Sequence, residues 1–130
     1  MQREDPEGIV LVCDFCRRDW DGVEPMIEGH HGSILCLECL KKALRQQQAA
    51  GATGEKYTCT LCLRFNISPE LPRWNGVAPA DGSAAATVCQ ECLYQSARTF
   101  SRNPDVEFTF DPAEYPQPVK PRREPQEKGG

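Results

Sequence analysis

The chain has 130 residues, of which 39% are hydrophobic, 26% are charged, 11 are proline and 8 are cysteine. Six of the prolines fall within the last 28 residues. The part able to fold is therefore nearer to about one hundred residues, a size at which a domain buries little apolar surface. A metal or covalent staple is expected, and an ordinary enzyme with a large hydrophobic core is disfavoured.

The charge of the chain disfavours nonspecific binding to nucleic acid. Lys and Arg number 15 and Asp and Glu 19, which gives a formal net charge of −4. Two zinc ions held by eight thiolates would bring it to about −8, whereas nonspecific nucleic-acid binding depends on neutralising many phosphates. The basic clusters at 17–18, 41–45 and 120–123 are more typical of solvated faces than of phosphate sites.

The N-terminal residues carry no targeting pattern that we recognise. Residues 1–8 are mixed in charge and are predicted to be a flexible segment. The apolar run that follows, residues 9–12, is too short for a signal-peptide core or a membrane span. We expect a cytoplasmic protein without a membrane partner.

Residues 9–50 are predicted to form a first finger. Cys13 and Cys16 follow an extended apolar stretch, as a metal-binding knuckle requires. Residues 25–28 and 33–35 are strand candidates joined by a Gly-His-His-Gly turn, which is typical of a hairpin. A helix is expected from Cys36, with its apolar face formed by Leu37, Leu40, Ala43 and Leu44.

Residues 57–102 repeat this order as a second finger, after a linker at 51–56 that belongs to a run of small residues. Here residues 68–87 hold three prolines and two glycines, and they predict a longer, looser loop. The second helix is expected from Cys89, with an apolar face of Leu93, Ala97 and Phe100. Residues 103–130 are predicted to be a disordered, Pro-rich tail, to which 106–110 could add one strand.

All eight cysteines occur as C-x-x-C pairs, a spacing that turns two sulfurs toward one ion. In a reducing compartment this pattern indicates metal rather than disulfides. Two zinc ions are the expected cofactors, with iron as a minor alternative. A thioredoxin-like redox site would need one reactive pair beside a βαβ unit, and that pattern is absent.

The pairs are expected to combine in chain order. Cross-braced modules set their middle ligands a few residues apart, whereas 19 residues separate Cys39 from Cys59. His30 and His31 are predicted to be exposed turn residues rather than ligands. The predicted metal ligands are Cys13, Cys16, Cys36 and Cys39 in site 1, and Cys59, Cys62, Cys89 and Cys92 in site 2.

Four thiolates close the coordination shell of each site, so we expect structural rather than catalytic metals, and no catalytic residues. The helix N-termini would stabilise the thiolates of the second pairs. Glu38 and Glu91, which lie between ligands in those first turns, are interpreted as helix-start residues. Overall the sequence predicts a small metal-bound α+β fold of two tandem fingers.

The first finger resembles the N-terminal four-cysteine zinc domain of the ClpX unfoldase. The matching residues are Cys13-x-Phe15-Cys16, Met26-Ile27-x-Gly29 and Ile34-Leu35-Cys36-x-Glu38-Cys39, and the second finger shares Cys59-x-x-Cys62 and Val88-Cys89-x-Glu91-Cys92-Leu93. The resemblance implies a treble-clef-like fold of knuckle, hairpin and helix. It also implies a protein-interaction element, because in that family the domain dimerises and recruits substrates or adaptors.

The chain departs from that family in two ways. Arg17 follows the knuckle where the family usually has glycine. Nothing beyond the fingers resembles the ATPase module, and residues 51–56 lack the G-x-x-x-x-G-K-[ST] spacing of a P-loop. No nucleotide is therefore expected as a ligand.

Three functions are compatible with these features. The leading hypothesis is a non-enzymatic, zinc-bound protein-interaction module, of adaptor or dimerisation type, with the apolar helix faces either packed within the chain or against a partner. The first alternative is nucleic-acid binding, in which Trp20 and Trp74 would stack on bases beside Arg17, Arg18 and Arg73. The second alternative is a redox- or zinc-responsive regulator.

Overall fold

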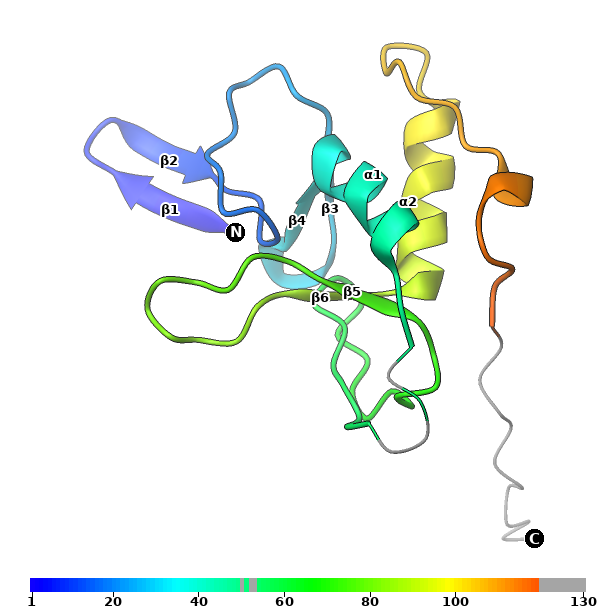
Figure 1. Ribbon diagram of the computed structural model, residues 1–130. Coiled ribbons are helices and arrows are strands. Elements are labelled where there is room, and N and C mark those ends of the chain that lie inside the picture. Colours follow the sequence, from blue (N-terminus) through cyan, green and yellow to red (C-terminus); the bar gives the residue numbers. More distant parts are fainter. Residues whose placement is uncertain (50, 52–53, 120–130) are drawn as a thin grey trace, which may run out of the picture.

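The computed structural model describes residues 1–49, 51 and 54–119 (Figure 1). Within these residues lie two α-helices, three two-stranded antiparallel sheets and two short 3-10 helices. The two α-helices lie side by side and pack against each other. The fold is thus a small α+β fold, as the sequence predicts, and no described helix is both long and apolar enough to cross a membrane.

The N-terminal residues form a hairpin rather than the flexible segment predicted for 1–8. Strand β1 (Gln2–Asp5) pairs antiparallel with β2 (Gly8–Leu11). The N-terminal ammonium of Met1 donates to the carboxylate of Asp14 at 2.7 Å, and it also donates to the carbonyl of Val12 at 2.8 Å. These contacts join the hairpin to the first knuckle.

The first finger has the predicted hairpin and helix. Strand β3 (Met26–Glu28) pairs with β4 (Ile34–Cys36), and the turn between them contains the short 3-10 helix η1 (His30–Gly32). Helix α1 (Leu37–Gln46) follows directly, with Cys36 as its N-cap residue.

The second finger repeats this order. Strand β5 (Arg73–Asn75) pairs with β6 (Thr87–Cys89), and helix α2 (Gln90–Arg102) follows with Cys89 as its N-cap residue. Strand β5 lies inside the stretch 68–87 that was predicted to be a loose loop. Part of the predicted linker, residues 52–53, lies outside the described residues.

The two apolar helix faces predicted from the sequence are buried within the chain. Helices α1 and α2 pack against each other, and the buried side chains belong to one continuous cluster. At most 7% of each of the predicted side chains is exposed: Leu37, Leu40, Ala43, Leu44, Leu93, Ala97 and Phe100. Packing within the chain, one of the two outcomes considered above, therefore accounts for both faces.

The first part of the predicted tail is packed rather than disordered. Phe110 lies between Tyr94 of α2 and Tyr115, with ring centroids 5.6 Å and 5.8 Å away. Aromatic pairs at such distances contribute beyond their buried area. The prediction of a disordered segment is thus wrong for 103–119, while 120–130 lies outside the described residues.

Polar contacts hold the same segment to α2. The hydroxyl of Tyr94 donates to the carbonyl of Pro116, and the amide of Val119 donates to the side-chain oxygen of Gln90 at 2.8 Å. A short 3-10 helix, η2 (Pro112–Glu114), lies in the chain between Phe110 and Tyr115. Residues 106–110 form no strand, because the segment runs along a helix and not along a sheet edge.

The two fingers exchange the same backbone contact in both directions. The amide of His30 in the first hairpin donates to the carbonyl of Leu61 in the second knuckle at 2.8 Å. The amide of Val77 in the second hairpin donates to the carbonyl of Phe15 in the first knuckle at 2.6 Å. Phe15 and Leu61 each lie two residues after the first cysteine of their knuckle, so the fingers are related by approximate two-fold symmetry.

Glycine is required at both of these crossings, where the hairpin of one finger passes the knuckle of the other. A Cβ on Gly29 would lie 2.7 Å from the carbonyl oxygen of Leu61, and a Cβ on Gly76 would collide with the backbone of Phe15. Both glycines directly follow the first strand of their hairpin. The absence of a side chain is thus what lets each hairpin approach the other finger's knuckle.

Candidate metal centres

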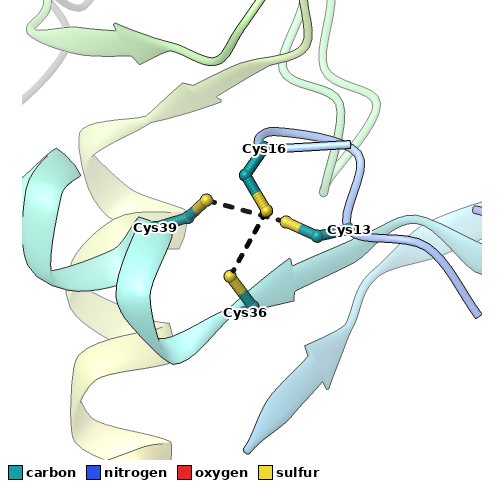
Figure 2. A group of neighbouring side chains, drawn as sticks. All are labelled: Cys13, Cys16, Cys36 and Cys39. Atoms are coloured by element: carbon teal, nitrogen blue, oxygen red, sulfur yellow. Dashed lines mark hydrogen bonds between the residues drawn. The ribbon is translucent and has the colours of Figure 1, made fainter. Parts of the chain in front are cut away.

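The first four cysteines form cluster 1 (Figure 2), in which the four Sγ atoms lie within 4.8 Å of one another. Cys13 and Cys16 come from the knuckle after β2, Cys36 ends β4, and Cys39 lies in the first turn of α1. The Sγ atoms of Cys13 and Cys39 are 3.7 Å apart, and those of Cys16 and Cys36 are 3.8 Å apart.

The other four cysteines form cluster 2 by the same construction. Cys59 and Cys62 lie in the second knuckle, Cys89 ends β6, and Cys92 lies in the first turn of α2. Their Sγ atoms again lie within 4.8 Å of one another, and those of Cys62 and Cys89 are 4.0 Å apart. The structure thus brings the cysteines together in the two groups that chain order suggested.

The spacing of the sulfurs fits a tetrahedral ion. Metal–sulfur bonds of about 2.3 Å place neighbouring sulfurs about 3.8 Å apart around a tetrahedral centre. A disulfide would need about 2.05 Å, and all eight cysteines are free thiols in the structure. The donor set and its spacing therefore suit zinc or another ion that prefers four thiolates.

Each knuckle is shaped by the same backbone turn. The amide of Arg17 donates to the carbonyl of Cys13, and the amide of Leu63 donates to the carbonyl of Cys59, both at 2.9 Å. Arg17 and Leu63 have φ angles of 64° and 62°, which lie in the left-handed region that glycine adopts most easily. This explains structurally why glycine suits the position that Arg17 occupies.

An arginine caps each cluster, a role that was not predicted from the sequence. The guanidinium of Arg18 donates to Cys16 at 3.4 Å and to Cys36 at 3.7 Å. The guanidinium of Arg64 donates to Cys62 at 3.4 Å and to Cys89 at 3.2 Å. These sulfurs raise the pKa of both arginines above the ordinary value. The signal was present, since each arginine lies two residues after the second cysteine of its knuckle.

Carboxylates pair with both arginines. Arg18 contacts Glu24 at 3.0 Å, and Arg64 contacts Glu91 at 3.0 Å. Glu91, interpreted from sequence as a helix-start residue, therefore also orients a guanidinium that faces the sulfurs. Charged hydrogen bonds of this kind stabilise thiolate and disperse the negative charge of a four-thiolate site.

The protonation of the clusters shows why they suit a cation. Hydrogen bonds with Cys36 and Cys39 lower the pKa of Cys13, while the hydrogen bond with Cys13 raises the pKa of Cys36 to about 12. In cluster 2 hydrogen bonds with Cys59 and Cys92 lower the pKa of Cys89, and the bond with Cys89 raises the pKa of Cys59 to about 11. The negative charge of one thiolate thus disfavours ionisation of the neighbouring thiols. A bound cation offsets this repulsion and allows all four to ionise.

The clusters differ in exposure. Cys16 is the one half-buried cysteine of cluster 1, whereas Cys62 and Cys92 are both half-buried in cluster 2. A groove of about 370 Å³ passes Cys62 and Cys92 and is also lined by His30 and Gln95. Cluster 2 is therefore the more accessible of the two.

The remaining candidate residues lie outside the clusters. His30 and His31 are in the exposed turn η1, and among the described residues neither belongs to a group of metal-binding side chains. Trp74 stacks on Phe15 with ring centroids 5.9 Å apart, and its indole donates to Gln46. The indole of Trp20 donates to the carbonyl of Glu24.

Comparison with known proteins identifies no relative. No family model matches the chain, and no curated protein and no solved structure is significantly similar to it.

Proposed function

We propose that the chain holds two structural zinc ions, one in each cysteine cluster. The observation that carries this proposal is the approach of four sulfurs to one another at tetrahedral spacing in both clusters. When bound, each ion links a knuckle to the start of a helix and takes the place of a larger apolar core. All four ligands come from the protein, so the ion keeps no position for a substrate.

Cobalt substitution tests this proposal. Co²⁺ bound by four thiolates gives intense tetrahedral visible bands and a sulfur-to-metal charge-transfer band. We expect these bands to rise until two equivalents per chain are bound, and Zn²⁺ to displace the cobalt. Octahedral cobalt spectra, or saturation below two equivalents, would contradict the assignment of two four-thiolate sites.

The proposed role of the metal-bound chain is protein interaction without catalysis, in a reducing compartment such as the cytoplasm. The proposal includes a treble-clef architecture, which the resemblance to the ClpX zinc domain implies. Because the helix faces are used within the chain, its interaction surface is assigned to exposed apolar residues elsewhere. The large ones are Ile9, Trp20, Val23, Leu63, Phe65, Val77 and Val119.

Nucleic-acid binding is the weaker candidate. Trp74 is engaged with Phe15 and Gln46, and Trp20 lies beside the acidic Glu24. A gel-shift titration with labelled single-stranded DNA and RNA at low salt separates the two functions, since phosphate contacts strengthen as salt falls. We expect no shift, and salt-dependent binding would favour the nucleic-acid function.

A redox-responsive role has one specific observation in its favour, the half-buried pair Cys62 and Cys92 beside the groove. Peroxide would take two electrons from two thiolates, which form a disulfide, and two protons would convert the reduced peroxide to two waters, with release of the metal. Mapping of disulfides by mass spectrometry after limited peroxide treatment tests this. Oxidation confined to cluster 2 with one equivalent of metal released is expected, and equal oxidation of both clusters would remove this candidate.

A further inference from the structure

The outer edge of strand β5 is covered by an extended residue of the same chain. Gln48, which follows α1, forms an antiparallel bridge with Arg73. The amide of each residue donates to the carbonyl of the other, and both distances are 2.9 Å. The second finger therefore shows how this hairpin accepts an added extended segment.

The first finger has the same edge without such a cover. Met26 is the counterpart of Arg73, because Met26 pairs with Cys36 and Arg73 pairs with Cys89. Residues of an antiparallel pair alternate between inward and outward hydrogen-bonding groups. The carbonyl of Pro25 accepts a hydrogen bond from the amide of Leu37 and therefore points toward the β4 side of the hairpin. The amide and carbonyl of the next residue, Met26, consequently point away from β4, toward the open edge.

These outward groups have no backbone partner within 1–49, 51 and 54–119, and the same is true of Glu28. An unpaired edge of this kind is a template for another strand. The symmetry of the fingers predicts a cover from the chain after α2, but residues 103–119 pack along α2 instead. The edge of β3 is consequently open.

A groove of about 430 Å³ runs beside this edge. Its lining includes all three residues of β3 and the apolar side chains Leu11, Trp20, Val23 and Ile34. Trp20 is 41% exposed and Val23 is 85% exposed. The groove thus offers an apolar seat for one side chain of a segment that pairs with β3.

The surroundings of the groove are acidic. Glu24 and Glu28 line it, and residues 1–28 contain eight acidic and three basic side chains. Charge of one sign near a groove attracts ligands of the other sign and selects against like charge. A segment with Lys or Arg beside its apolar residue complements this surface.

We propose that the open edge of β3 binds an extended segment of a partner protein, in which an apolar residue is flanked by Lys or Arg. The segment pairs with the backbone of Met26 as Gln48 pairs with Arg73, and its apolar side chain enters the groove beside Trp20. Backbone pairing provides the affinity in this mode, and the groove and its charges provide the selectivity. This inference rests on the proposed interaction function and names the partner's chemistry.

The test uses the metal-loaded full chain and three synthetic peptides, observed by amide NMR. The probe is acetyl-Lys-Val-Lys-Val-Lys-amide, and the controls are its Glu counterpart and a version with N-methylated backbone amides. We expect saturable shifts of the Met26 and Glu28 amides and the Trp20 indole with the Lys peptide, and at least tenfold weaker binding of both controls. Equal binding of all three peptides, or shifts centred elsewhere, would overturn the proposal.

A matched pair of variants tests the charge selectivity. Glu28→Lys changes an exposed residue of the groove, and Glu107→Lys makes the same change at an exposed residue outside it. Binding of the Lys peptide is expected to weaken severalfold in the first variant and to stay unchanged in the second. Equal effects would show general charge attraction and contradict a site at β3.

Two further measurements distinguish a failure of the proposed partner or site from a failure of the proposed metal function. A peptide of residues 112–130 tests whether a second copy of the chain is the occupant, and binding of this peptide in place of the Lys peptide overturns the choice of partner. Native mass spectrometry counts the metals in each sample. Loss of peptide binding with two ions present refutes the β3 site alone, whereas loss of the ions refutes the proposed metal function.

Discussion

The two fingers place different side chains on the same backbone frame. Both have a knuckle, a hairpin, a helix capped by a cysteine and an arginine over the sulfurs. They differ in what covers them, since Gln48 covers the edge of β5 and residues 103–119 cover α2. The sulfur clusters and the backbone contacts between the fingers therefore define the repeated unit, whereas the segments that pack over each finger differ.

The largest expected effect comes from removing the metals. A structural four-thiolate zinc site contributes on the order of 10 kcal/mol to folding at neutral pH. We expect a strong chelator to unfold both fingers, as measured by circular dichroism, and Zn²⁺ to restore the signal.

Single replacements then ask whether the fingers depend on each other. Cys36→Ser and Cys89→Ser are matched, because each removes the cysteine that ends a strand and caps a helix. Since α1 and α2 share one core, we expect either variant to disorder both helices in amide NMR. A variant in which the other finger keeps all its native amide shifts would show two independent units.

The next effect concerns the glycines at the crossings. Gly76→Ala should cost about 1–3 kcal/mol, in the range of overpacking, because its Cβ meets the backbone of Phe15. Gly82→Ala is the control, since it has a φ of +83° but open space around it. Denaturant unfolding of both variants compares the free-energy cost of steric overlap at Gly76 with that of backbone strain at Gly82. A larger loss for the control would contradict close packing at the crossing.

The segment 103–119, which packs over α2, is expected to contribute a comparable but smaller amount to the free energy of unfolding. Phe110→Ala removes a half-buried ring from between Tyr94 and Tyr115. We expect a loss of about 2 kcal/mol, which is below the range for fully buried phenylalanine. Thermal unfolding of metal-loaded protein measures it, with the exposed Phe65→Ala as control. Equal effects of the two changes would mean that 103–119 adds no stability.

The arginine caps should affect metal release more than stability. Arg64→Gln removes two hydrogen bonds to sulfur, and we expect release of one of the two ions to quicken about fivefold, or about 1 kcal/mol, because an exposed guanidinium is screened by solvent. Transfer of zinc to a chromophoric chelator measures the rate, and Arg98→Gln on the exposed face of α2 is the control. An unchanged rate in the first variant would contradict the cap.

The smallest expected effect is a loss of stability at alkaline pH that depends on Tyr57 of the second finger. Burial raises the pKa of Tyr57 to about 12, and its hydroxyl lies 3.3 Å from the carbonyls of Leu71 and Pro72. The folded state therefore favours the neutral phenol. Its contribution to stability is complete below about pH 10 and is lost as pH rises toward 12. We expect Tyr57→Phe to reduce this alkaline loss in denaturant unfolding, and an unchanged pH dependence would contradict it.

Local patterns in the sequence were sufficient for the hairpin at 25–35, for both helix faces and for the grouping of the cysteines. Each depends on residues close in sequence or on repeated C-x-x-C spacing. The N-terminal hairpin was missed because β1 is wholly exposed and polar. Long-range contacts such as the two hydrogen bonds from Arg3 to Asp19 hold it in place, and local periodicity carries no sign of them.

The cover over α2 was missed for a related reason. Phe110 and Tyr115 are isolated aromatic residues in a Pro-rich stretch, and composition alone classed that stretch as disordered. Phe110 packs against Tyr94 of α2, and Tyr115 packs in turn on Phe110, so their partial burial depends on a helix that lies earlier in the chain. The crossings at Gly29 and Gly76 were equally invisible, because each depends on a backbone carbonyl from the other finger.

The most direct test of the account is native mass spectrometry combined with elemental analysis of the intact, metal-loaded chain. We expect two zinc ions per chain, no disulfides, and loss of both ions when one cysteine of each cluster is changed to serine. Zero or one ion per chain, or a disulfide within a C-x-x-C pair, would contradict two fingers each built around its own metal.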